Sequence, residues 1–269
     1  MSKERRKVEW SLDLEDMKVR AGQFVSDAMG GRAETKTASL SESREGAASA
    51  KIAIAFPVGR ASIKALEAGA PNLFEAELRT IGEYEFDVSG GAERVIRLRQ
   101  KSGSAEDLGA MVGNARDLRW DIALARNMPM QLRLAAGVGA AHLDLRGLRI
   151  EALELASGVG KVALTLPARQ RVAAEIRGGV GITAVMIPAG AYGALDIKGG
   201  LGGVSLRVSR DAAARVEAKA GMGTINVPES YVRVSGEKRA KSPLIWHAAQ
   251  KLIIRYTGGL GRFELETAD

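Results

Sequence analysis

A glycine–apolar–glycine unit recurs along the second half of the chain at a fixed interval. The first five units begin 21 residues apart, and a sixth begins 38 residues after the fifth, which we interpret as one period plus an insertion of 17 residues. A fixed period of about 20 to 50 residues is typical of solenoids, propellers and other repeat arrays. The paired glycines, which we expect at structural corners, are Gly137, Gly139, Gly158, Gly160, Gly179, Gly181, Gly200, Gly202, Gly221, Gly223, Gly259 and Gly261.

Each repeat predicts two short β-strands that meet at its glycine corner. In "LELASGVGKVALTL" (153–166), for example, apolar residues alternate with polar or small ones on both sides of the corner. Such a rung cannot bury its apolar face alone, but rungs stacked at about 4.8 Å bury it continuously. We therefore predict an all-β fold: a right-handed parallel β-solenoid (β-helix-like) with 21-residue two-strand rungs, plus one N-terminal amphipathic helix. The predicted hand follows the preference of parallel crossovers.

The glycine units do not indicate a nucleotide site or an enzyme. A phosphate-binding loop needs Gly-x4-Gly-Lys-Ser/Thr opening a helix, whereas Lys161 is followed by a strand pattern. The chain has no cysteine and only two histidines, His142 and His247, which leaves little for thiolate or zinc chemistry. We expect no catalytic residues, no cofactor and no metal.

Three regions are predicted along the chain. Residues 1–31 form the N-terminal amphipathic helix, residues 32–117 an irregular β-repeat region ending in a loop (101–117), and residues 118–269 the regular solenoid with an insertion at about 229–250. The insertion carries lysine and arginine near Trp246, but an excursion this short favours a hairpin, and we expect no nucleic-acid partner. Without an apolar signal-peptide core or a run of about 20 apolar residues, we expect a soluble cytoplasmic protein.

The N-terminal helix has one apolar face, and two positions for it remain open. The simpler interpretation is that the helix packs on the solenoid, where outward residues of the sheet after the corner, such as His142, form a smooth stripe. The alternative is an anionic membrane surface, bound through residues 3–29 with their basic start. The apolar face consists of Leu14, Met17, Ala21, Phe24 and Ala28.

Charged residues recur with the same period on the outward side of the strand before each corner. Stacked like charges repel by about 1 kcal/mol in water, so neighbouring cations are needed for compensation. Two interpretations stay open: a solvated, self-neutralised surface, or a recognition surface or cation site. This candidate interaction face consists of the carboxylates Glu154, Glu175, Asp196 and Glu217 and the cations Arg177, Lys198 and Lys219.

The stretch "PMQLRLAAGVGAAHLDLRGLRIEALELASGVGKVALTLP" (129–167) resembles the toast-rack family of bacterial β-repeat domains, found in LiaF-like and related envelope-stress-associated proteins. The resemblance rests on both GVG corners, on "LDLRGL" (143–148) and on Pro167, and extends over residues 45–269. It implies a non-enzymatic β-repeat domain, often attached to membrane segments. This sequence shows no such segment.

We therefore predict a non-catalytic β-solenoid scaffold or protein-interaction module, linked through the resemblance to cell-envelope stress signalling. A protein partner is expected, and a homo-oligomer is an alternative assembly. The alternative functions are a self-assembling, bactofilin-like polymer, favoured by the open ends of solenoids, and a peripheral membrane-binding protein.

Overall fold

The structure is a computed structural model that describes residues 34–101, 105–219, 221–229, 231–233, 239–241 and 251–268. The predicted helix at 1–31 and most of the predicted insertion at 229–250 lie outside the described residues. No helix among the described residues is long and apolar enough to cross a membrane.

The described chain is almost entirely β-structure, which confirms the predicted all-β class. The elements are β1 (Lys36–Ser43), β2 (Ser49–Ala65), β3 (Asn72–Thr80), β4 (Tyr84–Ser89), β5 (Glu93–Gln100), α2 (Ala105–Gly113), β6 (Arg119–Leu124), β7 (Pro129–Asp144), β8 (Arg149–Ala156), β9 (Val159–Thr165), β10 (Arg171–Arg177), β11 (Val180–Ile187), β12 (Tyr192–Lys198), β13 (Leu201–Ser209), β14 (Ala214–Lys219), β15 (Met222–Asn226), β16 (Val232–Arg233), β17 (Arg239–Lys241), β18 (Leu252–Thr257) and β19 (Leu260–Ala268).

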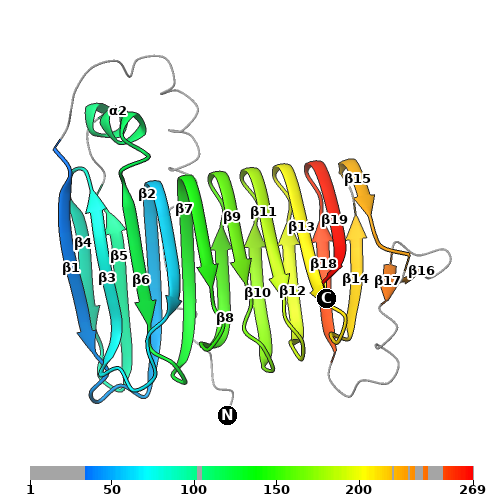
Figure 1. The fold of residues 1–269 in the computed structure, drawn as a ribbon, viewed down its shortest axis with the longest axis horizontal. Coiled ribbons are helices and arrows are strands. Elements are labelled where there is room, and N and C mark those ends of the chain that lie inside the picture. The colour runs from blue at the N-terminus through cyan, green and yellow to red at the C-terminus, as the bar shows by residue number, and fades with distance from the viewer. Residues whose placement is uncertain are drawn as a thin grey trace, which may run out of the picture.

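The repeat region consists of parallel ladders in which each strand pairs with the second strand after it. β8, β10 and β12 form one run, and β9, β11 and β13 form the other. Paired residues are one sequence period apart, as Gly160 and Gly181 are. The parallel part of the sheet curls nearly closed, through 324°, and one apolar core lies inside it from Ala50 to Leu265. Figure 1 shows the strands side by side along the long axis.

We expected from the 21-residue spacing that the rungs stack in the order of the sequence. The last two repeats do not follow that order. β18 pairs with β12 on one side and with β14 on the other, and β19 lies in the same way between β13 and β15. The sixth unit is therefore inserted between the fourth and the fifth. In Figure 1 the red strands β18 and β19 stand between the yellow β13 and the orange β15.

Side-chain size explains this order. At each inward position the sixth unit carries a larger residue than its ladder partner in the fifth unit. The pairs are Leu252 with Ala214, Ile254 with Val216, Tyr256 with Ala218 and Phe263 with Ile225. Tyr256 and Phe263 also stack, with ring centroids 4.4 Å apart. An inner rung is covered on both sides, so burying the larger side chains there removes more apolar surface from water, at about 0.8 kcal/mol per methylene.

The N-terminal end, predicted as an irregular β-repeat region, is also interleaved and is partly antiparallel. β2 lies between β7 on one side and β5 and β6 on the other. Beyond them the pairing becomes antiparallel, with β4 on β5, and with β3 on β6 and β1 on β3. The short connection through Gly90 and Gly91 accounts for the β4–β5 hairpin, because a parallel pair needs a long crossover.

The segment predicted as a boundary loop (101–117) contains the helix α2, so that part of the prediction was wrong. Met111 of α2 is buried against Val58, Ile81 and Leu118, and Val138 packs on the same cluster. α2 therefore covers the corner of the first two rungs. Leu108 and Ala110 of α2 pack on the same cluster, and such tertiary packing supplies most of the stability of a short helix.

The glycine corners stack on one another with almost no space between rungs. Gly181 has a φ of +132°, and a Cβ at this position would overlap the carbonyl oxygen of Gly160. Gly59 in β2 aligns with Gly139 and has a φ of +114°. This corner was not predicted, because Pro57 stands in place of its first glycine and the Gly-apolar-Gly pattern is lost.

Candidate interaction face

The candidate interaction face lies on the outer surface of β8, β10, β12, β18 and β14. Glu154, Glu175 and Asp196 are direct neighbours across the parallel ladders, as the period predicted. Glu217 is not the next in the column, because the inserted β18 places Arg255 between Asp196 and Glu217. The predicted row of four adjacent carboxylates is therefore a row of three, followed by an arginine and a fourth carboxylate.

Arginines close both ends of the three-carboxylate row. Arg133 of β7 is the ladder neighbour of Glu154 and donates two hydrogen bonds to its carboxylate, each 2.9 Å long. At the other end Arg255 forms ion pairs with Asp196 at 3.1 Å and with Glu217 at 4.0 Å. Each arginine thus offsets part of the repulsion that the stacked carboxylates would otherwise impose.

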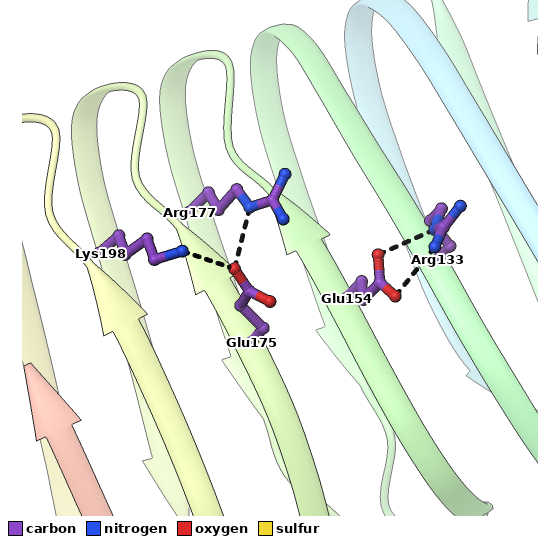
Figure 2. Close-up of polar contacts among 5 residues, drawn as sticks. All are labelled: Arg133, Glu154, Glu175, Arg177 and Lys198. Carbon is purple, nitrogen blue, oxygen red and sulfur yellow. Dashed lines mark hydrogen bonds and ion pairs between the residues drawn. The ribbon is translucent and has the colours of Figure 1, made fainter. Parts of the chain in front are cut away.

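Glu175 occupies the centre of the row and is held by two cations. Arg177 Nε lies 3.0 Å from its carboxylate and Lys198 Nζ lies 3.1 Å from the same oxygen (Figure 2). Hydrogen bonds from Arg177 and Lys198 lower the pKa of the Glu175 carboxyl below its usual value of 4.5, although partial burial opposes the shift. Glu175 is therefore ionised throughout the neutral range.

The basic residues of the predicted face are also separated by the insertion. Arg177 and Lys198 are ladder neighbours, but Thr257 lies between Lys198 and Lys219. Arg133 and Arg255 were not among the residues predicted for this face. Both stand six residues before the second glycine of their unit, the same position as the four carboxylates, so this alignment contained the signal for both.

Most of the charged side chains of this face are engaged with one another at the surface. Its carboxylates are all in ion pairs with arginine or lysine, and its side chains are exposed or half-buried. A shallow depression lies over Ala135 and Ala156, between Arg133, Glu154 and Arg177. Among the described residues no group of three or more histidine, aspartate or glutamate side chains is placed to hold a metal ion.

These features define a repeat protein built from parallel β-rungs, with a surface row of three carboxylates that has an arginine at each end. The chain belongs to the toast-rack family: the family model described as the N-terminal domain of toast_rack, DUF2154, matches residues 29–186. That match confirms the resemblance seen in the sequence.

Two solved structures match this chain at low sequence identity, and of these two the first supports a shared fold. A "putative cell adhesion protein" from Clostridium sporogenes has a TM-score of 0.60 and 17% identity, covering 87% of this chain and 100% of its own. A "putative adhesin" from Bacteroides fragilis has a TM-score of 0.36 and 13% identity, covering 86% of this chain and 97% of its own. No curated protein matches the sequence significantly.

Proposed function

We propose that this chain is a non-catalytic scaffold, a right-handed β-solenoid whose charged face binds a protein partner. The observation that carries the proposal is the exposed, regularly spaced row from Arg133 through Glu154, Glu175 and Asp196 to Arg255. Exposed ion pairs are worth only about 0.2 to 1 kcal/mol each, so a partner can replace them at little cost.

The order of charges on the row sets the kind of partner. Two arginines enclose three carboxylates along five rungs, a length of about 19 Å at the usual strand spacing. A complementary surface carries basic residues over the centre and acidic residues over both ends. Such complementarity contributes mainly to specificity and to the rate of association. A role in envelope-stress signalling is part of this proposal and rests on the family resemblance.

Site-specific photo-crosslinking in the native host tests the proposal. A photoreactive residue at Ala156, in the depression of the face, is expected to capture one protein. A probe at His142, which is exposed on β7 beyond the glycine corner, is expected not to capture it. The double variant Glu175→Lys, Asp196→Lys should abolish capture. The matched control reverses Glu83 and Glu85, exposed or half-buried carboxylates in ion pairs at the N-terminal end, and should retain it. Capture that survives the first reversal would refute the role of the face.

Adhesion is a second candidate, supported by the likeness of the fold to the Clostridium sporogenes structure along nearly the whole chain. Beads coated with the purified chain should then bind cells, and the same charge-reversal variants would show whether the charged face takes part.

The polymer alternative has less support. At one end of the coil β17 runs antiparallel against β14, and at the other end β1 runs antiparallel against β3. These strands interrupt the parallel register that end-to-end stacking of rungs would require, and covered edges are a common protection against such growth. The membrane-binding alternative depends on residues 3–29, which lie outside the described residues.

A further inference from the structure

A second surface runs along the glycine corners, where the two strands of each rung meet. The residue between the two glycines of each unit is apolar, and the parallel ladders place these residues in one line. We call this line the apolar ridge. In spatial order it consists of Val159, Val180, Leu201, Leu260 and Met222. These side chains are 40% to 74% exposed, and a contiguous line of exposed apolar side chains is typical of an interaction surface.

At the N-terminal end of the molecule the same line of corners is covered by a helix. Val58 and Val138 continue the ridge in ladder register with Val159. Val58 is buried, and both valines pack in one cluster with Met111 of α2. Figure 1 shows α2 at the edge where the rungs turn at their glycine corners, beyond the ends of the strands. Within this chain, the cover that fits the corners is thus a helix with its apolar side inward.

The backbone at the corners favours a helix over a strand as the ligand of the ridge. Val180 N–H donates to the Gly158 carbonyl and Leu201 N–H to the Gly179 carbonyl, so these groups already pair between rungs and offer no open strand edge. A helix satisfies its own backbone and binds through side chains alone. Its apolar stripe advances about 5.4 Å per turn, close to the rung spacing of about 4.8 Å, and the ridge extends over about 19 Å.

Every position of the ridge has a cation beside it. The cation stands two residues after the ridge residue or three residues before it, and no acidic residue stands in that interval in any of the five units. The pairs are Val159 with Lys161, Val180 with Arg177, Leu201 with Lys198, Leu260 with Arg262, and Met222 with Lys219, and all five cations are exposed.

Three of these cations keep their charge uncompensated. Arg177 and Lys198 share the single carboxylate of Glu175. In the described part of the chain, the remaining three, Lys161, Arg262 and Lys219, take part in no ion pair. The ridge is therefore an apolar line with a net positive border, and its complement is apolar in the middle and acidic at the sides.

We propose that the apolar ridge binds an acidic amphipathic helix of a partner protein, which continues the cover that α2 begins. The apolar stripe of that helix packs on the ridge, and its carboxylates pair with the bordering cations. A second copy of this chain fits less well, because two ridges in contact would bring their cations together. A flat lipid bilayer also fits less well, because α2 stands beyond the corners and would meet it first (Figure 1). This surface is distinct from the row of carboxylates on the charged face.

Fluorescence anisotropy with a synthetic probe tests this proposal on the full-length chain. The probe is a labelled helical peptide of about 18 residues, or 27 Å, with leucine along one face, glutamate on both sides of that stripe and alanine elsewhere. At about 50 mM salt it should bind with a dissociation constant below about 100 µM. A peptide with lysine in place of glutamate should bind at least about tenfold more weakly. Absence of binding, or equal binding of the two peptides, would overturn the proposal.

Variants of the chain locate the binding surface. Leu201→Ser with Leu260→Ser removes apolar side chains from two neighbouring rungs and should weaken binding of the glutamate peptide at least about tenfold. Both side chains are exposed, so the fold should persist, which far-UV circular dichroism checks. Unchanged affinity in this variant would show that the peptide binds elsewhere and would contradict the proposal.

Charge reversal at the border has a matched control. Lys161→Glu with Arg262→Glu should also weaken binding at least about tenfold. Arg171→Glu with Lys251→Glu reverses the same number of exposed charges at the ends of β10 and β18 away from the glycine corners, and should keep the affinity within about twofold. An equal loss in both variants would mean that net charge alone attracts the peptide.

A photoreactive residue at Leu201 in the native host gives a second readout. The crosslinked segment, mapped by mass spectrometry, is expected to be an acidic amphipathic sequence of another protein. Crosslinks to this chain itself, within one copy or between two, or to lipid alone, would contradict the proposal. The variant Glu175→Lys, Asp196→Lys, which disrupts the charged face, should not remove the crosslink, so the two proposals fail separately.

Discussion

Replacing Gly181 by alanine should be among the most damaging single-methyl additions to this protein. Two costs add. The backbone at Gly181 has a φ of +132°, where a side chain costs about 1 to 2 kcal/mol. The new Cβ would also overlap the Gly160 carbonyl oxygen and lie 2.9 Å from its carbonyl carbon.

Relief of that overlap requires the rungs to move apart at the corner. This movement would weaken two hydrogen bonds at the corner. Val180 N–H donates to the Gly158 carbonyl and Leu201 N–H donates to the Gly179 carbonyl, both at 2.9 Å. Each contributes about 1 kcal/mol net. We therefore expect Gly181→Ala to lower the free energy of unfolding by about 3 to 4 kcal/mol.

Urea unfolding followed by far-UV circular dichroism measures this effect, with two matched controls. Gly69 has a φ of +84° but nothing within 4 Å of a Cβ, so Gly69→Ala should cost only the backbone strain of about 1 to 2 kcal/mol. Gly91 has neither constraint, and Gly91→Ala should change stability by less than about 0.5 kcal/mol. If Gly181→Ala lowers the free energy of unfolding no more than Gly69→Ala does, then close stacking of the rungs is not the reason that the corners require glycine.

Three further predictions concern single positions. Arg169 has a φ of 54°, so Arg169→Gly should stabilise the fold by about 0.5 kcal/mol in the same urea assay. Arg255→Ala removes the cation between two carboxylates and should cost about 0.5 to 1 kcal/mol at low salt, with the loss shrinking at about 1 M salt. Because cations lower the pKa of Glu175 below 4.5, its stabilisation is present above that pH and is lost as the pH falls through the lowered pKa. The stability gap between wild type and Glu175→Gln should therefore narrow in acid.

The repeat made the architecture of the middle of the chain predictable from sequence. Period-two alternation assigned the strands, and the fixed 21-residue step assigned which residues become ladder neighbours, as Glu154 and Glu175 do. Both signals are local or periodic, so one sequence sufficed to read them. The same alignment would also have identified Arg133.

The order of the last rungs could not be read in this way. The step from Gly200 to Gly221 equals the others, so the spacing fits sequential stacking as well as an insertion. The order depends on which rung buries more apolar surface at an inner position. Tyr256 and Phe263 of the sixth unit are larger than their partners in the fifth unit, so the sixth unit gains more from that position. The composition of the charged face depends on it too, because β18 brings Arg255 into the row.

The N-terminal part was less predictable because its signals are weak. Pro57 replaces the glycine that would have marked the corner at Gly59. The helix α2 spans nine residues without a sustained apolar period. Tertiary packing of Met111 holds it in place, and the local sequence pattern does not predict such packing.

The insertion of the sixth unit between the fourth and the fifth is the central structural claim, and disulfide formation tests it directly in this cysteine-free chain. Glu264 is the ladder partner of both Ser205 and Asn226, so the pairs 205/264 and 226/264, replaced by cysteine, should each form a disulfide. Ser205 and Asn226 are then two strand spacings apart, about 9.6 Å, beyond the roughly 7 Å that a disulfide spans. Ready oxidation of the 205/226 pair, with no bond in 205/264, would mean that the rungs stack in sequence order.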